Sequence, residues 1–171
     1  MLNLTLRNEQ ADDIESIFNI TQSAFEHAAH TDHTEQLIVN ALRKANQLSI
    51  SIVAELDDKI IGHIAISPVV ISSGEQNWYG LGPVSVVPAY QQQGVGKALI
   101  QQSLHQLKQQ GAAGCVVLGD PAYYSKFGFK PYPNLILENV PAEYFQTLAF
   151  TPVIPHGTVK YHSAFEVTAS P

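Results

Sequence analysis

The sequence predicts a mixed α/β fold, α+β in stricter usage, in which antiparallel hairpins precede a strand–helix–strand unit. Two β-rich runs, SISIVAEL and KIIGHIAISPVVI, are joined by Asp57-Asp58, which is a hairpin signature. Further along, a β-rich run that ends in VSVVP, a helical run and the apolar run GCVVLG follow one another. With 171 residues, 45% of them hydrophobic, the chain has the size and composition of one globular domain, which we expect to span residues 1–171.

The first elements are predicted by their periodicity. Residues 2–7 alternate apolar and polar side chains, as a short strand does. Asp12 and Asp13 precede a helix whose apolar residues recur at helical spacing as far as Phe25, with the acids at the positive end of the helix dipole. Thr34 is expected to cap a second helix before the two β-rich runs begin.

The later elements continue the alternation. A Ser-Ser-Gly-Glu turn leads into the strand WYGLGPVSVVP, and the helix that follows has Leu99, Ser103 and Leu107 on one stripe and ends at Gly111. GCVVLG is expected to be a buried strand and AYYSKF a short helical turn. The tail from FGFKPY onward holds six of the ten prolines, and TVKYHSAFEV is expected to close the fold as a strand.

Composition excludes several classes of protein. The net charge of −6 argues against a protein that binds a nucleic acid backbone, which needs a basic surface. No apolar run approaches the length of a membrane span and no signal sequence precedes the fold, so we expect a cytoplasmic protein without a membrane partner. The single cysteine, Cys115, fits a reducing compartment, and its apolar surroundings favour a buried strand residue over a nucleophile.

The stretch AYQQQGVGKALIQQSL (residues 89–104) places Gly94 and Gly96 where a helix should begin, although glycine is a poor helix former. Amides at a helix start have no partner within the helix, and with the helix dipole they form an anion site that glycine lets a phosphate approach. A P-loop would need glycine at Gln91 and a hydroxyl at Ala98, and a dinucleotide fingerprint would need a small residue at Leu99. The remaining alternative is a turn whose glycines only permit a close strand–helix junction.

Two motifs together resemble the GNAT superfamily of acetyl-CoA-dependent N-acyltransferases. Gln91-x-x-Gly94-x-Gly96, preceded by VSVVP, is similar to the pyrophosphate loop of that family, and YSKFGF within residues 122–129 is similar to its later Tyr-x-Lys-x-Gly-Phe element. The resemblance covers essentially the whole chain. LGDPAYYSKFGF and the closing YHSAF look most like a subgroup of predicted bacterial acetyltransferases of unassigned substrate.

The resemblance implies a mainly antiparallel central sheet, flanked by helices and splayed at a bulge, which we expect at Gly80-Leu81-Gly82-Pro83 because glycine and proline interrupt strand ladders. It implies acetyl-CoA as co-substrate, held by backbone amides of the turn and of the strand before it. The residues it assigns to acetyl-CoA are Val84, Ser85, Val86, Gln91, Gln92, Gln93, Gly94, Val95, Gly96, Lys97, Tyr124 and Phe127. Lys97 either adds charge to this site or is solvated.

Two catalytic roles follow from the same resemblance. The Val86 N–H is expected to stabilise the oxyanion as the amine attacks the thioester. Tyr124 occupies the usual general-acid position of the family, from which a phenol can protonate the departing thiolate; the alternative is a packing aromatic whose hydroxyl makes a structural bond.

The acceptor side is less defined by the sequence. His33 or Glu35 is a candidate base or acceptor contact, a water chain is the alternative, and a solvated polar loop is a third interpretation. His27, His30 and His33 recur every three residues, yet nothing completes a ligand set, so we expect no metal. His63, within a β run, is interpreted as a satisfied core histidine.

Aromatic residues offer two further surfaces. Trp78 and Tyr79 either line an acceptor site through an aromatic–cation contact or fill a sheet surface. The proline-rich tail, with Tyr144, Phe145 and Phe150, is expected to pack over the second half of the sheet and narrow the pocket, or to supply a dimer surface. Monomer and homodimer both remain open.

The function expected is transfer of the acetyl group from acetyl-CoA to the primary amine of a small molecule by direct attack. Two alternatives belong to other classes: an acetyltransferase acting on protein N-termini or lysines, and an acyl-CoA-binding sensor without turnover. The retained Tyr124 favours an enzyme, because binding alone needs no proton donor at the thiol.

Overall fold

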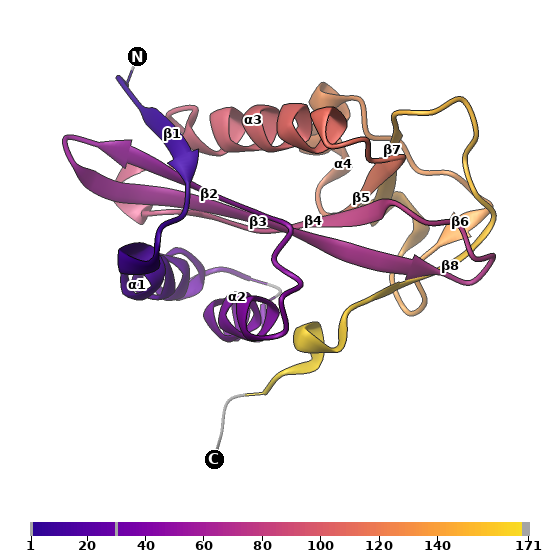
Figure 1. The fold of residues 1–171 in the computed structure, drawn as a ribbon, viewed down its shortest axis with the longest axis horizontal. Helices are drawn as coiled ribbons and strands as arrows, with labels where there is room; N and C mark the ends of the chain where they lie inside the picture. Colours follow the sequence, from indigo (N-terminus) through magenta and orange to yellow (C-terminus); the bar gives the residue numbers. More distant parts are fainter. Residues whose placement is uncertain (1, 30, 169–171) are drawn as a thin grey trace. The chain divides into compact units, whose positions relative to one another are not determined.

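The computed structural model describes residues 2–29 and 31–168 and has the mixed α/β element order that the sequence predicts (Figure 1). The strands are β1 (Thr5–Asn8), β2 (Ile50–Leu56), β3 (Lys59–Ile71), β4 (Trp78–Val86), β5 (Gly114–Leu118), β6 (Leu135–Ile136), β7 (Phe145–Ala149) and β8 (Gly157–Tyr161). The helices are α1 (Ile14–Phe25), α2 (Glu35–Lys44), α3 (Val95–Gln109) and the short α4 (Pro121–Tyr124).

The chain divides into two compact units, each with its own part of the sheet. The first comprises the described residues of 1–66, 82–104 and 163–171, and the second comprises residues 67–81 and 105–162. The long elements β3, β4 and α3 begin in one unit and end in the other. Within residues 2–29 and 31–168, no helix is long and apolar enough to cross a membrane.

The first unit contains the strand order β1-β2-β3-β4. β1 pairs antiparallel with β2, and β2 with β3, through the predicted hairpin, in which Asp57 and Asp58 both have positive φ, 50° and 64°. Two consecutive positive φ values are typical of the tight turn that matches strand twist. The hairpin prediction is therefore confirmed, and β1 begins at Thr5 rather than at residue 2.

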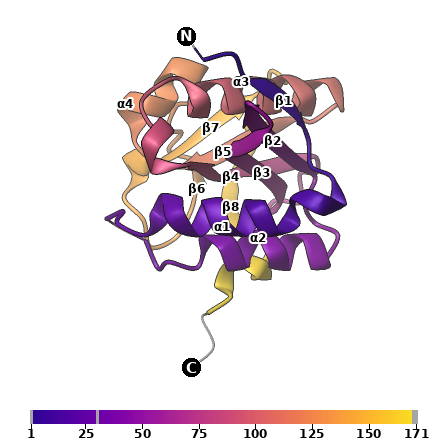
Figure 2. The same ribbon diagram turned by 90° about the vertical axis from the view of Figure 1, so that its left-hand side faces the viewer.

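Helices cover both faces of this part of the sheet. α1 and α2 lie side by side on one face (Figure 2), where Ile17 and Val39 pack with Val53 and Ala65 in a buried cluster. The start of α3 covers the other face, where a Cβ at Gly62 would lie only 2.9 Å from a Val95 methyl carbon. Thr34 stands at the start of α2 as predicted, but its side chain makes no capping hydrogen bond.

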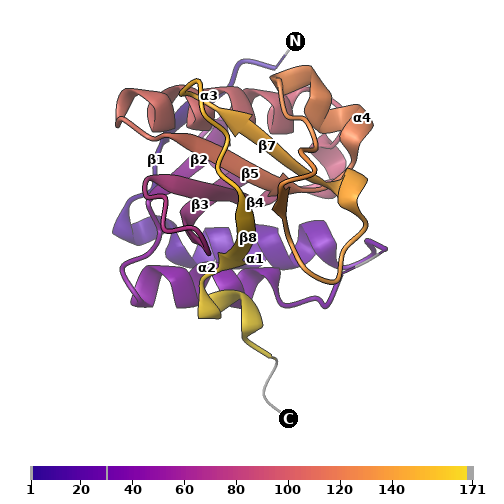
Figure 3. The same ribbon diagram turned by 90° about the vertical axis from the view of Figure 1, so that its right-hand side faces the viewer.

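The second unit contains the parallel strand pair that the predicted strand–helix–strand unit requires, and it has a core of its own. The first three residues of β4 pair parallel with β5, and β5 pairs antiparallel with β7 beside it (Figure 3). The end of β3 pairs antiparallel with β8, which pairs parallel with β6. Antiparallel pairs thus predominate, as predicted. The buried cluster of this unit comprises Val69, Ile71, Trp78, Val116, Leu135, Phe145 and Val159.

The β4–β5 ladder ends inside the tetrapeptide where a bulge is expected. Its last registered pair is Gly80 with Val116, although β5 continues to Leu118. Gly82 has φ +130°, a conformation that favours glycine. Cys115, in the middle of β5, is fully buried, and burial raises the pKa of its thiol, in agreement with its interpretation as an inert strand residue.

The tail differs from its prediction in two places. Residues 145–149 form the strand β7 within the sheet, so Phe145 is buried as part of a strand rather than as part of a covering loop. The closing strand ends at Tyr161, and Ser163–Glu166 form a 3-10 helix in the first unit instead of continuing the strand. Both differences arise because strand partners distant in sequence decide where a ladder forms or stops.

Candidate functional site

The turn between β4 and α3 presents a row of free amides. Gln92 and Gly94 have positive φ, 61° and 87°, which turns the chain sharply before Val95 starts the helix. The amide of Ala98 donates to the Gly94 carbonyl at 3.0 Å, and this is the first bond of the helical ladder. Among the described residues, no hydrogen bond is donated by the main-chain amides of residues 92–97. Six donors therefore stand at the positive end of a 15-residue helix, as an anion site requires.

Side chains of the same loop hold this arrangement in place. The Gln91 amide group donates to the Val86 carbonyl at 3.0 Å, and the Gln93 amide group donates to the Ala89 carbonyl at 3.1 Å. Both glutamines thus bridge their own loop, which orients its main chain. Lys97 is exposed in the first turn of the helix.

The reason for glycine at position 94 is its backbone conformation. A Cβ at Gly94 would meet no atom within 4 Å, so crowding at the strand–helix junction does not explain this residue, whereas its φ does. The close approach of strand and helix occurs instead at Gly62, where an added Cβ would meet Val95 and Leu99. Nothing in the local sequence pattern around Gly62 indicates this contact.

Tyr124 is held firmly within the second unit. The Asp120 carboxylate accepts a hydrogen bond from the Ala122 amide at 2.9 Å and so caps α4. A Cβ at Gly119 would lie 2.4 Å from the Tyr124 ring, so only glycine leaves room for the ring there. Tyr123 and Phe129 lie edge-on to the Tyr124 ring, at centroid distances of 5.1 and 6.0 Å.

Burial raises the pKa of Tyr124 to about 12, with smaller contributions from Tyr123 and Cys115. The phenol therefore keeps its proton throughout the neutral range. No hydrogen bond among the described residues engages its hydroxyl, which leaves it able to donate to a ligand. Phe127 belongs to the same aromatic group, at a centroid distance of 5.5 Å from Tyr123.

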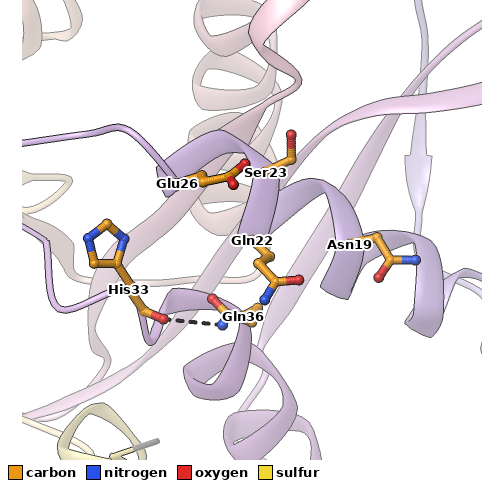
Figure 4. A pocket seen from close by; sticks show the side chains of 6 residues that line it. All are labelled: Asn19, Gln22, Ser23, Glu26, His33 and Gln36. Carbon is orange, nitrogen blue, oxygen red and sulfur yellow. Dashed lines mark hydrogen bonds between the residues drawn. The ribbon is translucent and has the colours of Figure 1, made fainter.

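A polar cavity of about 560 Å³ lies in the first unit at α1, α2 and the segment before α2 (Figure 4). Its α1 residues recur at helical spacing on one face of that helix. The cavity is lined by Asn19, Gln22, Ser23, Glu26, His33 and Gln36. The Gln36 amide group donates to the His33 carbonyl at 3.1 Å, which ties the preceding loop to the helix.

The other residues considered for the acceptor lie elsewhere. Glu35 does not line this cavity; one of its carboxylate oxygens accepts a hydrogen bond from the Thr31 hydroxyl. Trp78 is only 3% exposed, and its ring fills the space above Gly114, where a Cβ would lie 2.3 Å away. Trp78 is therefore a core residue, as in the second interpretation given for it. Tyr79 is half-buried in β4.

The histidine triplet is described only in part. His27 is exposed with its Nε2 4.0 Å from a Glu26 oxygen, and His30 lies outside the described residues. Within residues 2–29 and 31–168, no three His, Cys, Asp or Glu side chains gather as metal ligands would.

A buried polar network in the first unit was not expected from the sequence. Arg43 donates to both oxygens of Glu9, at 2.7 and 2.8 Å, and the Ser51 hydroxyl also bonds to Glu9. Ser51 Oγ lies 2.8 Å from Nε2 of His63, which is fully buried. Burial lowers the pKa of His63 to about 4. These residues are far apart in sequence, so no local pattern could have united them.

The structure is an α/β fold with a mixed sheet, helices on both faces, and a glycine turn that leaves the first amides of a long helix free, which is the arrangement that suits a phosphate-bearing ligand. The chain belongs to the acetyltransferase (GNAT) family, whose model matches residues 14–129. The family and the fold inferred from the two motifs are thereby confirmed.

Relatives with known sequences and structures agree. The chain is 38% identical over 97 residues to the uncharacterized N-acetyltransferase YhbS of Escherichia coli strain K12, a match that spans 56% of this chain and 58% of that protein. A GNAT family acetyltransferase from Brucella melitensis, solved in complex with acetyl-CoA, is 47% identical and has a TM-score of 0.86, covering 96% of this chain and 99% of that one. YhbS from Escherichia coli, solved in complex with CoA, is 30% identical with a TM-score of 0.88, covering 99% and 95%.

Proposed function

We propose that this chain transfers the acetyl group from acetyl-CoA to the primary amine of a small molecule by direct attack of the amine. The observation that carries the proposal is the row of free amides at residues 92–97, in a chain 47% identical to a relative that holds acetyl-CoA. Free amides at a helix N-terminus suit the diphosphate of the co-substrate, and Gly94 places no side chain over them.

The strand before the turn would align the thioester. The main-chain groups of Val84 and Val86 would bind the arm that carries the acetyl group. The Val86 N–H would donate to the acetyl oxygen as negative charge develops there, which lowers the barrier when the donor is already oriented. The bond from Gln91 to the Val86 carbonyl supports that orientation from the other side of the residue.

Tyr124 would supply the proton that the departing thiolate needs. Its raised pKa, about 12, keeps the phenol protonated at neutral pH, and its ring is fixed by the aromatic residues around it. A positioned acid typically contributes a rate factor of about 10² to 10⁴. The fixed ring and the unengaged hydroxyl support the acid role over the packing role.

The polar cavity at α1 and α2 supports a small acceptor. Its volume of about 560 Å³ lies within the usual range for small-ligand pockets, about 300–1,000 Å³. A small molecule would therefore fill it without an extended peptide. Glu26 would pair with an ammonium group, and the amide side chains of Asn19 and Gln22 would bind polar substituents. His33 lines this cavity, whereas Glu35 as an acceptor contact stays a prediction.

A panel of amines, with N-terminal and lysine peptides included, tests the proposal by following the release of free thiol from acetyl-CoA. Turnover of small amines above peptides would support it. Preference for peptides would favour the protein-modifying alternative. Tight binding of acetyl-CoA by calorimetry without turnover of any amine would favour the sensor.

A further inference from the structure

Among the described residues of the first unit, four side-chain polar atoms are buried without a hydrogen bond, and two of them lie on neighbouring strands. Nδ1 of His63 and Oγ of Ser85 are both buried without a hydrogen bond among the described residues. His63 is 0% exposed and Ser85 is 1% exposed. A buried polar atom without a partner destabilises a fold, so two such atoms on neighbouring strands indicate a role beyond packing.

The strand register brings these two side chains together. The Val87 amide donates to the Ile61 carbonyl at 2.9 Å, and β3 and β4 are consecutive strands joined by a six-residue turn, residues 72–77, which makes them antiparallel. In an antiparallel ladder this bond sets Ser85 opposite His63, on the same face of the sheet. Side chains directly opposite each other have Cβ atoms about 4.5–5.5 Å apart, a separation that a rotamer change or one water molecule can bridge.

The rest of the network determines which nitrogen of His63 carries the proton. Burial acts to raise the pKa of Glu9, but hydrogen bonds from Arg43 and Ser51 outweigh it and hold the pKa below its usual value, so Glu9 is an ionised acceptor. The Ser51 hydroxyl must then donate to Glu9, and its oxygen accepts from Nε2–H of His63. Nδ1 of the neutral ring therefore carries a lone pair on the side without a partner.

We propose that Ser85 and His63 together remove the proton from the attacking amine, with Ser85 in contact with the amine and His63 acting through it. This inference rests on the proposed function, because Ser85 stands between Val84 and Val86, the residues assigned to the thioester. As the C–N bond forms, the nitrogen becomes more acidic. Its N–H bond breaks toward Ser85 Oγ while the Ser85 proton passes to Nδ1 of His63.

The imidazolium that results is short-lived, because burial lowers the pKa of His63 to about 4, but it keeps a hydrogen-bond acceptor on its other side. Its Nε2–H points to Ser51, whose hydroxyl bonds to the Glu9 carboxylate, and Glu9 is held by Arg43. After the product leaves, the Nδ1 proton returns through Ser85 to solvent, so the side chains recover their starting state. Among the charged groups around His63, Glu9 and Asp13 raise its pKa and Arg43 lowers it.

The decisive variant is Ser85→Ala, with Ser103→Ala as the matched control. Ser103 is equally buried, and its hydroxyl donates to the Ile100 carbonyl within α3, away from the pair. Ser85→Ala should lower kcat about 100-fold near neutral pH and recover toward wild type at high pH as hydroxide replaces the base. The Kd for acetyl-CoA should stay unchanged, because the contacts expected from this strand are made by main-chain groups that the substitution keeps. Ser103→Ala should leave the pH profile of kcat unchanged. Equal pH profiles for Ser85→Ala and wild type would overturn the proposal.

A second measurement does not depend on turnover. The ¹⁵N resonances of His63 should show a protonated Nε2 and a bare Nδ1 at neutral pH, and Ser85→Ala should shift the Nδ1 resonance. The opposite tautomer, or an Nδ1 chemical shift that is the same in Ser85→Ala and in the wild type, would overturn the pairing of Ser85 with His63. If the wild-type protein acetylates no amine, the proposed function is refuted. If Ser85→Ala turns over normally, only the role of Ser85 and His63 is refuted.

Discussion

Replacing Gly94 by glutamate should abolish acetyl-CoA binding while the protein still folds. Residue 94 lies among the free amides, and no atom would contact its Cβ, so the new side chain has room beside the diphosphate site. A carboxylate about 5 Å from one phosphate charge, at an effective dielectric of about 20, opposes binding by about 3 kcal/mol. That energy corresponds to a Kd about 200-fold weaker.

The same substitution strains the backbone, and a second glycine measures that strain separately. Gly111, beyond the other end of α3, has φ +86°, against +87° at Gly94, and its Cβ position is also open. A left-handed conformation costs a residue with a side chain roughly 1–2 kcal/mol, so Gly94→Glu and Gly111→Glu should lose similar stability in urea unfolding.

Isothermal calorimetry with acetyl-CoA then separates the two effects. Only Gly94→Glu should lose affinity, because only that carboxylate stands at the helix N-terminus. A Kd within twofold of wild type in folded Gly94→Glu, or an equal loss in both variants, would refute the assignment of this turn to the diphosphate.

Three further predictions concern other residues. Tyr124→Phe should lower kcat about 100-fold with an unchanged Kd for acetyl-CoA, because the raised pKa of Tyr124 suits a proton donor; equal kcat values would make Tyr124 structural. Gly62→Ala should lower the free energy of unfolding, measured by urea denaturation, by about 1–3 kcal/mol, because the new Cβ would lie 2.9 Å from Val95 and 3.0 Å from Leu99. An unchanged free energy of unfolding would contradict this close packing. Burial lowers the pKa of His63 from 6.5 to about 4, so on acidification the unfolded chain binds the proton before the folded protein does. The free energy of unfolding of the wild type should therefore fall by about 3 kcal/mol as the pH drops from 7 through 4. His63→Gln should lack the part of this fall that His63 causes, and parallel curves of stability against pH for the two proteins would contradict the prediction.

The sequence by itself determined the turns and helices whose conformation depends on residues close to one another along the chain. Asp57-Asp58 adopts the positive φ values of a tight hairpin, and the stripe of Leu99, Ser103 and Leu107 is buried on α3. The glycine turn before α3 could be interpreted as an anion site because unpaired amides are a property of any helix start. The two motifs that carried the family resemblance are likewise short and contiguous.

Tertiary structure alone decided the features that join distant residues. Residues 145–149 became a strand because β5 offered them hydrogen-bond partners, and Trp78 became a core residue because Gly114 leaves space for its ring. Ser51, His63 and Ser85 come from separate strands, and only the register of β2, β3 and β4 brings them to one face. Periodicity reports which face of an element is apolar, but it does not report which side chain lies opposite, because that depends on strand pairing across the fold.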